Sequence, residues 1–241
     1  YFATALKENG KAALVMANSA SDAGGSELEI RKKMIEEGII SQMVTLPSNM
    51  FSTVTLPATL WFFDKAKRNS DKKDEILFID ARNVFTQVDR AHRKFSEEQI
   101  KNLSVITRLY NGETEAFTDL IKEYKTALEQ APDTAEDKET KTKSYFKEQI
   151  AWLQERFPEG KYQDVIGLCK VAKLNGEDGI IDQDYSLNAG RYVGVVIEDD
   201  GMTESEFKDK ILSLHSEYEK LSAESKELEE KIKQNLKELF N

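Results

Sequence analysis

The sequence is poor in the residues that build disulfides and metal centres. Its 241 residues include one cysteine and two histidines. A single cysteine cannot form an internal disulfide, which is typical of proteins that work in a reducing compartment. Two histidines and one cysteine also cannot build a typical zinc site. We therefore expect a cytoplasmic protein without a metal centre.

The short motifs of common enzyme classes are absent from the printed chain as well. It contains no P-loop, no G-x-G-x-x-G, no H-E-x-x-H, no C-x-x-C and no G-x-S-x-G. His92 and His215 lie in segments of helical pattern, which favours surface positions over catalytic ones. Cys169 is expected to be a small buried apolar residue. Taken alone, the residues predict no catalytic constellation.

Long apolar runs and an excess of positive charge are also missing. No run approaches the roughly 20 residues of a membrane span, and the N-terminus has no export signal, so we expect no membrane association. The formal net charge is -10, which argues against a protein that binds nucleic acid over its whole surface. The chain begins at Tyr1 without an initiator methionine, and we expect a fragment of a longer protein.

One segment departs from the acidic average. From Lys65 to Lys94, nine Lys and Arg residues face five Asp and Glu residues, which gives a charge of +4. A solvated loop and helix face is the simpler interpretation of this excess, and a phosphate-binding patch is the alternative.

Residues 1–95 have the pattern of an α/β domain. The apolar run KAALVMAN, which begins at Lys11, predicts a strand covered on both faces, as in a parallel sheet. A helix is expected from about Ser26, with Ser26 as N-cap and Glu29 as its capping-box partner. The segments IISQMVTL, TLWFF and EILFIDA predict three further strands, the last two joined as a hairpin by a polar turn.

Residues 96–200 have a mostly helical pattern and are expected to form an extension of that domain. Ser96 and Gln99 resemble a capping box at the start of a helix. A second helix is expected from Glu115 to Gln130 and a third from Tyr145 to Arg156, each followed by a proline.

Residues 201–241 carry the clearest periodicity of the chain. Apolar side chains recur at alternating steps of four and three residues, a spacing that predicts a coiled-coil helix. We expect this seam to dock a partner through Phe207, Ile211, Leu214, Tyr218, Leu221, Leu228 and Ile232. An amphipathic helix that folds back on its own domain is the alternative.

Five blocks of the sequence together carry a family resemblance. They are KAALVMANSA, Gly24-Gly25 with EIRKKMIEEGII, LPSNMFSTVTLPATLWFFDK, EILFIDAR, and SLNAGRYVG ahead of the terminal helix. In this order they resemble the C-terminal part of the modification (M) subunit of type I restriction-modification systems, a family of adenine-specific DNA methyltransferases that use S-adenosylmethionine. The resemblance covers most of residues 1–100 and 160–241, whereas residues 101–160 match poorly. It implies that residues 1–95 are the C-terminal part of a Rossmann-like methyltransferase sheet.

The same resemblance implies that key motifs lie outside this chain. The family's cofactor loop, Asp-Pro-x-x-Gly-Ser-Gly, and its catalytic Asn-Pro-Pro-Phe/Tyr motif are absent, and none of the four prolines is adjacent to another. Both motifs belong upstream of Tyr1, so we expect the catalytic residues and most of the cofactor site elsewhere and the fragment alone to be inactive. A truncated sheet would expose an edge and an apolar face, which invites self-association.

The resemblance also assigns a role to the most apolar stretch, LPSNMFSTVTLPATLWFF. An enzyme that methylates the exocyclic amine of adenine must turn that base out of the duplex. In related methyltransferases a phenylalanine just before the penultimate strand stacks on the base, and Phe51 occupies that place. Thr53 and Pro57 would shape the loop beside it. The alternative is that Phe51 is a core residue.

Partners follow from the resemblance too. It implies DNA as substrate, a specificity (S) subunit docked on the C-terminal seam, and a restriction (R) subunit in the same complex. The alternative is a non-catalytic, acidic α/β interaction module that dimerises through its C-terminal helix.

Overall fold

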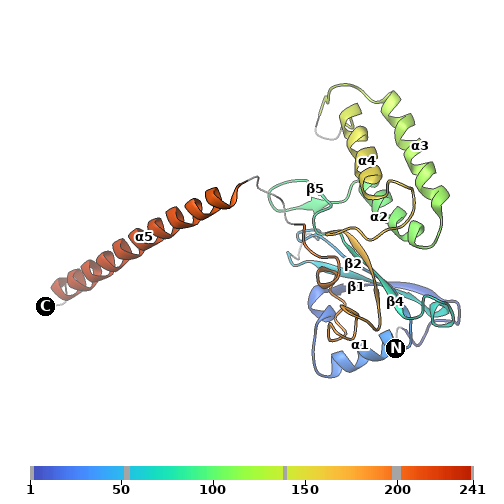
Figure 1. Cartoon of the computed structure of the whole chain (residues 1–241), viewed down its shortest axis with the longest axis horizontal. Helices are drawn as coiled ribbons and strands as arrows, with labels where there is room; N and C mark the ends of the chain where they lie inside the picture. Colours follow the sequence, from blue (N-terminus) through green and yellow to red (C-terminus); the bar gives the residue numbers. More distant parts are fainter. Residues whose placement is uncertain (1–2, 52–54, 138–139, 197–201, 240–241) are drawn as a thin grey trace. The chain divides into compact units, whose positions relative to one another are not determined.

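The chain divides into two compact units. The computed structural model describes residues 3–51, 55–137, 140–196 and 202–239. One unit is Tyr1–Val196 and the other is Ile197–Asn241. The first is a mixed sheet with helices on both faces, and the second consists of one long helix (Figure 1).

Five strands form the central sheet of the first unit. They are β1 (Lys11–Ala17), β2 (Ile40–Thr45), β3 (Ala58–Asp64), β4 (Glu75–Asp80) and β7 (Cys169–Lys173), arranged in the order β1-β3-β2-β4-β7. Strands β2 and β4 are parallel, whereas β3 is antiparallel to β1 and β2, and β7 is antiparallel to β4. Because β1, β2 and β4 therefore run in the same direction, all three end at one edge of the sheet, called the carboxyl edge below.

Helices cover the two faces of this sheet unequally (Figure 1). One face packs against α2 (Glu97–Tyr110), α3 (Thr114–Gln130) and α4 (Lys143–Arg156), and the other packs against α1 (Ser26–Glu36) and residues 180–193. Side chains alternate between these faces along each strand. On β4, Leu77 joins the core under α2 to α4, whereas its neighbour Phe78 joins the opposite core.

Two expectations about the strands are wrong. Strands β3 and β4 do not form a hairpin, because β2 lies between them. Their connection contains the short helix η2 (Lys65–Asn69) and is long enough to step over one strand; Lys67 Nζ holds it by donating to the carbonyl of Lys73 at 2.7 Å. Strand β1 is not covered on both faces: it is the last strand of the described sheet, and Val15 is 55% exposed.

The helix starts depend on their capping residues. The capping box at Ser96 is confirmed, since Ser96 Oγ accepts from the Gln99 amide at 3.2 Å and Gln99 Oε1 accepts from the Ser96 amide at 2.8 Å. The helices expected from Glu115 and Tyr145 are α3 and α4, each beginning one or two residues earlier. The predicted Ser26 cap is wrong. Gly25 holds the N-cap position at φ 61°, a left-handed conformation that glycine tolerates, so Ser26 already lies in the first turn.

The segment expected as a helical extension is helical only in part. After α4 the chain returns to the sheet as β7 and then crosses to the face covered by α1. There the ring of Tyr192 stacks on Phe78 with centroids 4.0 Å apart and planes inclined by 19°. Both parts of the first unit therefore contribute to a single sheet and its cores.

The second unit contains α5 (Glu204–Leu239), a helix of 36 residues. Thr203 caps it, because Thr203 Oγ1 accepts from the Glu206 amide at 3.3 Å and Glu206 Oε2 accepts from the Thr203 amide at 2.7 Å. No side chain between Glu204 and Leu239 is buried. The helix is present where the periodicity placed it, and its pairing as a coiled coil remains a prediction. Within the described chain, no helix combines the length and apolarity required to cross a membrane.

Candidate functional site

The loops at the carboxyl edge of the sheet form the candidate site. In open α/β sheets, ligands bind in the crevice outside the carboxyl ends of the strands. Asn18 follows β1, residues 46–57 follow β2, and residues 81–95 follow β4. Backbone hydrogen bonds join these loops: the Ala81 amide donates to Thr45 O at 2.9 Å, and the Asn18 amide donates to Pro57 O at 3.4 Å.

The loop between β2 and β3 presents an apolar tip to solvent. The Asn49 amide donates to Thr55 O at 3.2 Å and closes the loop, and Asn49 itself has a φ of 61°, which asparagine tolerates better than most residues. Within this closed loop Phe51 is 41% exposed, and Leu56, just after it, is 70% exposed. Among the described residues, Phe51 belongs to neither core cluster. The loop therefore holds an aromatic ring at the surface instead of in the interior.

The other residues predicted for this site lie beside the loop or outside the described structure. Thr53 falls in residues 52–54, outside the described residues. Pro57 is half-buried, and its carbonyl joins the loop to the end of β1 through Asn18. Thr59 Oγ1 strengthens this junction by donating to Asn18 Oδ1 at 2.8 Å.

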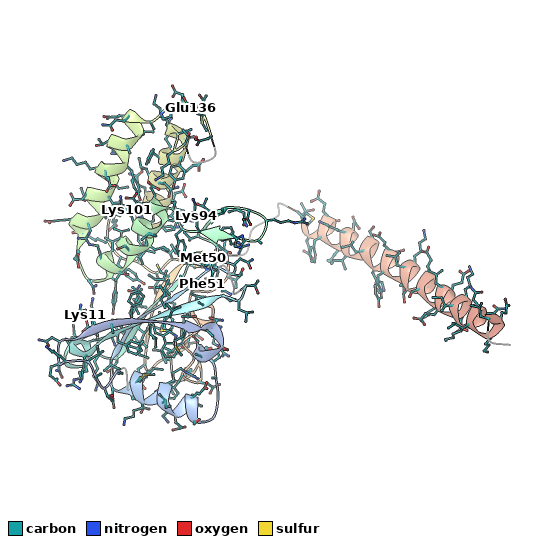
Figure 2. The ribbon with its side chains drawn as sticks, turned by 180° about the vertical axis from the view of Figure 1, so that it is seen from behind. Lys11, Met50, Phe51, Lys94, Lys101 and Glu136 are labelled. Atoms are coloured by element: carbon teal, nitrogen blue, oxygen red, sulfur yellow. The ribbon has the colours of Figure 1, made fainter. Side chains whose placement is uncertain are left out.

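A small basic hairpin is hydrogen-bonded to the same loop. It consists of β5 (Thr86–Gln87) and β6 (Arg93–Lys94). The Arg93 amide donates to Asn49 O at 2.9 Å, Arg93 Nη1 donates to Ser48 Oγ at 3.1 Å, and the guanidinium carbon lies 4.0 Å from the centroid of the Phe85 ring. In Figure 2, Met50, Phe51 and Lys94 lie on the same side of the unit. The charge count of Lys65 to Lys94 indicated a basic segment, but it did not reveal these bonds to Ser48 and Asn49 in the Phe51 loop.

A buried carboxylate at the end of β4 is fully engaged with its neighbour. Arg82 Nε donates to Asp80 Oδ1 at 2.9 Å and to Oδ2 at 3.0 Å, and Arg82 Nη2 also binds Oδ2. The hydrogen bond to Asp80 raises the pKa of Arg82. This pair fixes the loop after β4.

The described residues offer no metal cluster, and their one cysteine is not a nucleophile. They contain no group of three or more His, Cys, Asp or Glu residues that could hold a metal ion. Cys169 is buried, and this burial raises the pKa of its thiol to about 12. The thiol is therefore protonated at neutral pH and unreactive, since the thiolate is the nucleophile.

The seam residues predicted to bind a partner all lie on α5. Their side chains are 49–68% exposed from Phe207 through Ile232. The structure thus presents the apolar stripe of α5 on its surface.

Known proteins similar to this chain include DNA methylases. Residues 1–125 match the family N-6 DNA Methylase. The methylase subunit of the type I restriction enzyme MjaIX from Methanocaldococcus jannaschii is 34% identical over 229 residues, which are 95% of this chain and 32% of that protein. The methylase subunit of the type I restriction enzyme HindI from Haemophilus influenzae is 31% identical over 233 residues, 96% of this chain and 40% of that protein.

Solved structures include a type I restriction-modification methyltransferase subunit from Streptococcus thermophilus. The two structures align with a TM-score of 0.48 and 22% sequence identity, and the alignment covers 78% of this chain and 28% of the Streptococcus thermophilus chain. The chain thus spans 32% and 40% of the length of the two curated relatives above.

Proposed function

The chain belongs to the N-6 DNA methylase family, and from this membership we propose that it is the C-terminal part of the modification subunit of a type I restriction-modification complex. The full-length enzyme is an adenine-specific DNA methyltransferase of the cytoplasm, which transfers a methyl group from S-adenosylmethionine to the exocyclic amine of adenine. The structural observation that supports this proposal is the exposed ring of Phe51 at the carboxyl edge of the sheet.

Phe51 is proposed to hold the target adenine outside the duplex. Enzymes that modify a base inside DNA turn it out of the stack and hold it against aromatic or apolar side chains. Stacking of a base on an aromatic ring contributes about 1–3 kcal/mol. The Asn49–Thr55 hydrogen bond closes the base of this loop, which keeps Phe51 at the exposed tip where a base could meet its ring.

The cofactor site is proposed to lie mostly outside this chain. S-adenosylmethionine supplies the methyl group when bound, but the printed sequence lacks the family's cofactor loop and its Asn-Pro-Pro-Phe/Tyr motif. Gly24 and Gly25 at the carboxyl edge face open space, since a Cβ atom built on either residue meets nothing within 4 Å, so no described side chain closes over this pair. We assign none of the described residues to the cofactor, and the fragment alone is inactive in this proposal.

Helix α5 is proposed to dock the specificity subunit. Its 36 residues span about 54 Å at 1.5 Å per residue, and its apolar stripe is exposed. Helices with such a stripe bury it against a partner helix. The complex would also contain the restriction subunit, and sequence recognition would be delegated to the specificity subunit.

The test is methylation by the full-length protein. Purified with its specificity subunit, it should transfer labelled methyl groups from S-adenosylmethionine to duplex DNA, and mass spectrometry of the digested product should identify N6-methyladenine. DNA that already carries the methyl group is the control. A full-length protein that lacks both motifs and methylates nothing, yet dimerises through α5, would instead be the non-catalytic interaction module.

A further inference from the structure

The β5–β6 hairpin carries positive charge directly beside the Phe51 loop. The Arg93 amide is bonded to Asn49 O, two residues before Phe51. Arg90 lies in the turn of the hairpin and is exposed. We propose that this hairpin binds the phosphodiester backbone of DNA next to the base held by Phe51, with Arg90 as the contacting residue. The inference rests on the proposed function.

Within the turn of the hairpin, no acidic side chain forms an ion pair with Arg90. Asp89, its acidic neighbour, accepts hydrogen bonds from the amides of Ala91 at 2.8 Å and His92 at 2.9 Å, and both carboxylate oxygens lie within 2.9 Å of His92 Nδ1. These hydrogen bonds lower the pKa of Asp89 and keep it ionised, and the bond from the Ala91 amide has the largest effect. The carboxylate is therefore used to build the turn that presents Arg90.

Acidic residues on both sides of the hairpin are paired elsewhere. Asp80 is bound by Arg82, Glu97 lies 2.7 Å from Lys101 Nζ, and Glu98 lies 2.7 Å from Lys141 Nζ. Their charges are thus matched by bases other than Arg90. On a chain of net charge -10, a phosphate backbone can approach only where positive charge is locally in excess.

The position of the hairpin fits the geometry of base flipping. A flipped nucleotide rotates about its own backbone, so its flanking phosphates stay next to the loop that holds the base. Arg93 fixes the hairpin against that loop through Ser48 Oγ and the carbonyl of Asn49. An arginine fork at the adjacent turn suits phosphate oxygens, which it can bind through two parallel hydrogen bonds.

The test measures the salt dependence of DNA binding. Full-length protein with its specificity subunit is titrated into a fluorescent duplex at several salt concentrations, and log Kd is plotted against log salt. Each phosphate contact contributes about 0.9 to this slope. Arg90→Gln should lower the slope by about 0.9, whereas Arg90→Lys should keep it. Lys125→Gln, which removes an exposed charge from α3, is the matched control and should also keep the wild-type slope.

The outcomes separate this inference from the proposed function. A wild-type slope for Arg90→Gln, in a protein whose wild type methylates adenine, would overturn the hairpin contact and leave the function intact. An equal drop for Lys125→Gln would overturn it too, because any lost charge would then suffice. Absence of methylation and DNA binding by the wild type would overturn both proposals.

Discussion

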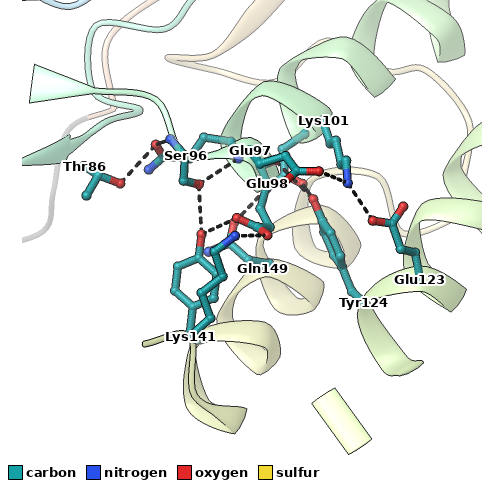
Figure 3. A network of polar contacts seen from close by, with 12 residues as sticks. Thr86, Ser96, Glu97, Glu98, Lys101, Glu123, Tyr124, Lys141 and Gln149 are labelled. Atoms are coloured by element: carbon teal, nitrogen blue, oxygen red, sulfur yellow. Dashed lines mark hydrogen bonds and ion pairs between the residues drawn. The ribbon is translucent and has the colours of Figure 1, made fainter. Parts of the chain in front are cut away.

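Lys141 Nζ lies 2.7 Å from Oε1 of Glu98, and this ion pair joins the segment before α4 to the first turn of α2 (Figure 3). The side chain of Glu98 is only 7% exposed. Its other carboxylate oxygen accepts from the Tyr145 hydroxyl at 3.0 Å, and its backbone carbonyl accepts from the Tyr124 hydroxyl at 3.1 Å. One residue of α2 is thereby bonded to both α3 and α4.

We predict that Glu98→Gln destabilises the three-helix layer. The substitution leaves Lys141 without its charged partner, and breaking a pair with one buried member should cost about 1–3 kcal/mol in the free energy of unfolding. Urea unfolding of the 241-residue chain at pH 7 measures the loss. Glu129→Gln, which changes an exposed residue of α3, should be nearly neutral. Equal stability of the two variants would contradict a structural role for Glu98.

The contribution of Glu98 should also depend on pH. Burial acts to raise the pKa of Glu98, but the hydrogen bonds and charge of Lys141, with the Tyr145 hydroxyl, outweigh it and the pKa is lowered. A carboxyl whose pKa is lower in the folded state stabilises fully above its unfolded pKa, about 4.3, and loses this effect as pH falls through the folded pKa. The stability difference between wild type and Glu98→Gln should be constant near pH 7 and shrink below about pH 4. A difference that grows in acid would contradict this sign.

Phe51→Ala in the full-length enzyme should weaken methylation of paired adenine. Loss of about 1–3 kcal/mol of stacking corresponds to a roughly 5- to 150-fold lower kcat/KM. Phe51→Tyr keeps an aromatic face and should retain most activity. Calorimetry should find the affinity for S-adenosylmethionine unchanged in both variants. Equal loss of methylation and cofactor binding would count against stacking.

Glutamate at two seam positions of α5 should prevent assembly. Leu214→Glu with Leu221→Glu places charge in the apolar stripe and should abolish copurification with the specificity subunit. Ser216→Glu with Ala223→Glu adds the same charge at positions outside the stripe and should leave copurification intact. Near-ultraviolet circular dichroism should report an unchanged first unit in both. Persistent copurification of the first pair would remove the docking role of the seam.

The 241-residue chain alone should not bind S-adenosylmethionine. No residue we describe is assigned to the cofactor, and the family's cofactor loop is absent from the printed sequence. Isothermal calorimetry with the purified chain should give no heat of binding, whereas the full-length protein should bind. Micromolar affinity of the chain would place part of the cofactor site among its own residues.

Local features of the fold were predictable and the long-range ones were not. Ser96 and Gln99 marked the start of α2 because a capping box is complete within four residues. Strand β7 forms by pairing with β4, which lies about ninety residues earlier, and the short sequence of Cys169–Lys173 has no pattern that would predict a strand. The predicted hairpin of β3 and β4 was wrong for the same reason, because the pairing of β2 with both strands is decided by tertiary contacts and not by local sequence.

The site was predictable only in part, because residue type does not reveal exposure. Phe51 and Phe63 belong to the same apolar stretch, yet Phe51 is 41% exposed and Phe63 is 3% exposed. Phe63 lies on β3 and packs in the core, whereas Phe51 lies in the loop between β2 and β3, and only the pairing of these strands decides which ring is buried. The excess of Lys and Arg from Lys65 to Lys94 indicated a positive segment, but it did not indicate which of those residues would lie beside the loop.

Helix α5 has a consequence for how the protein behaves at low concentration. It buries no side chain along Glu204–Leu239, and ion pairs within it, such as Lys208 with Glu204, contribute only about 0.2–0.5 kcal/mol each. A solitary helix in water is marginal without packing. In the proposed complex its ordered length would therefore be governed by mass action: dilution below the dissociation constant for the specificity subunit would unwind it, and reassociation would wind it again.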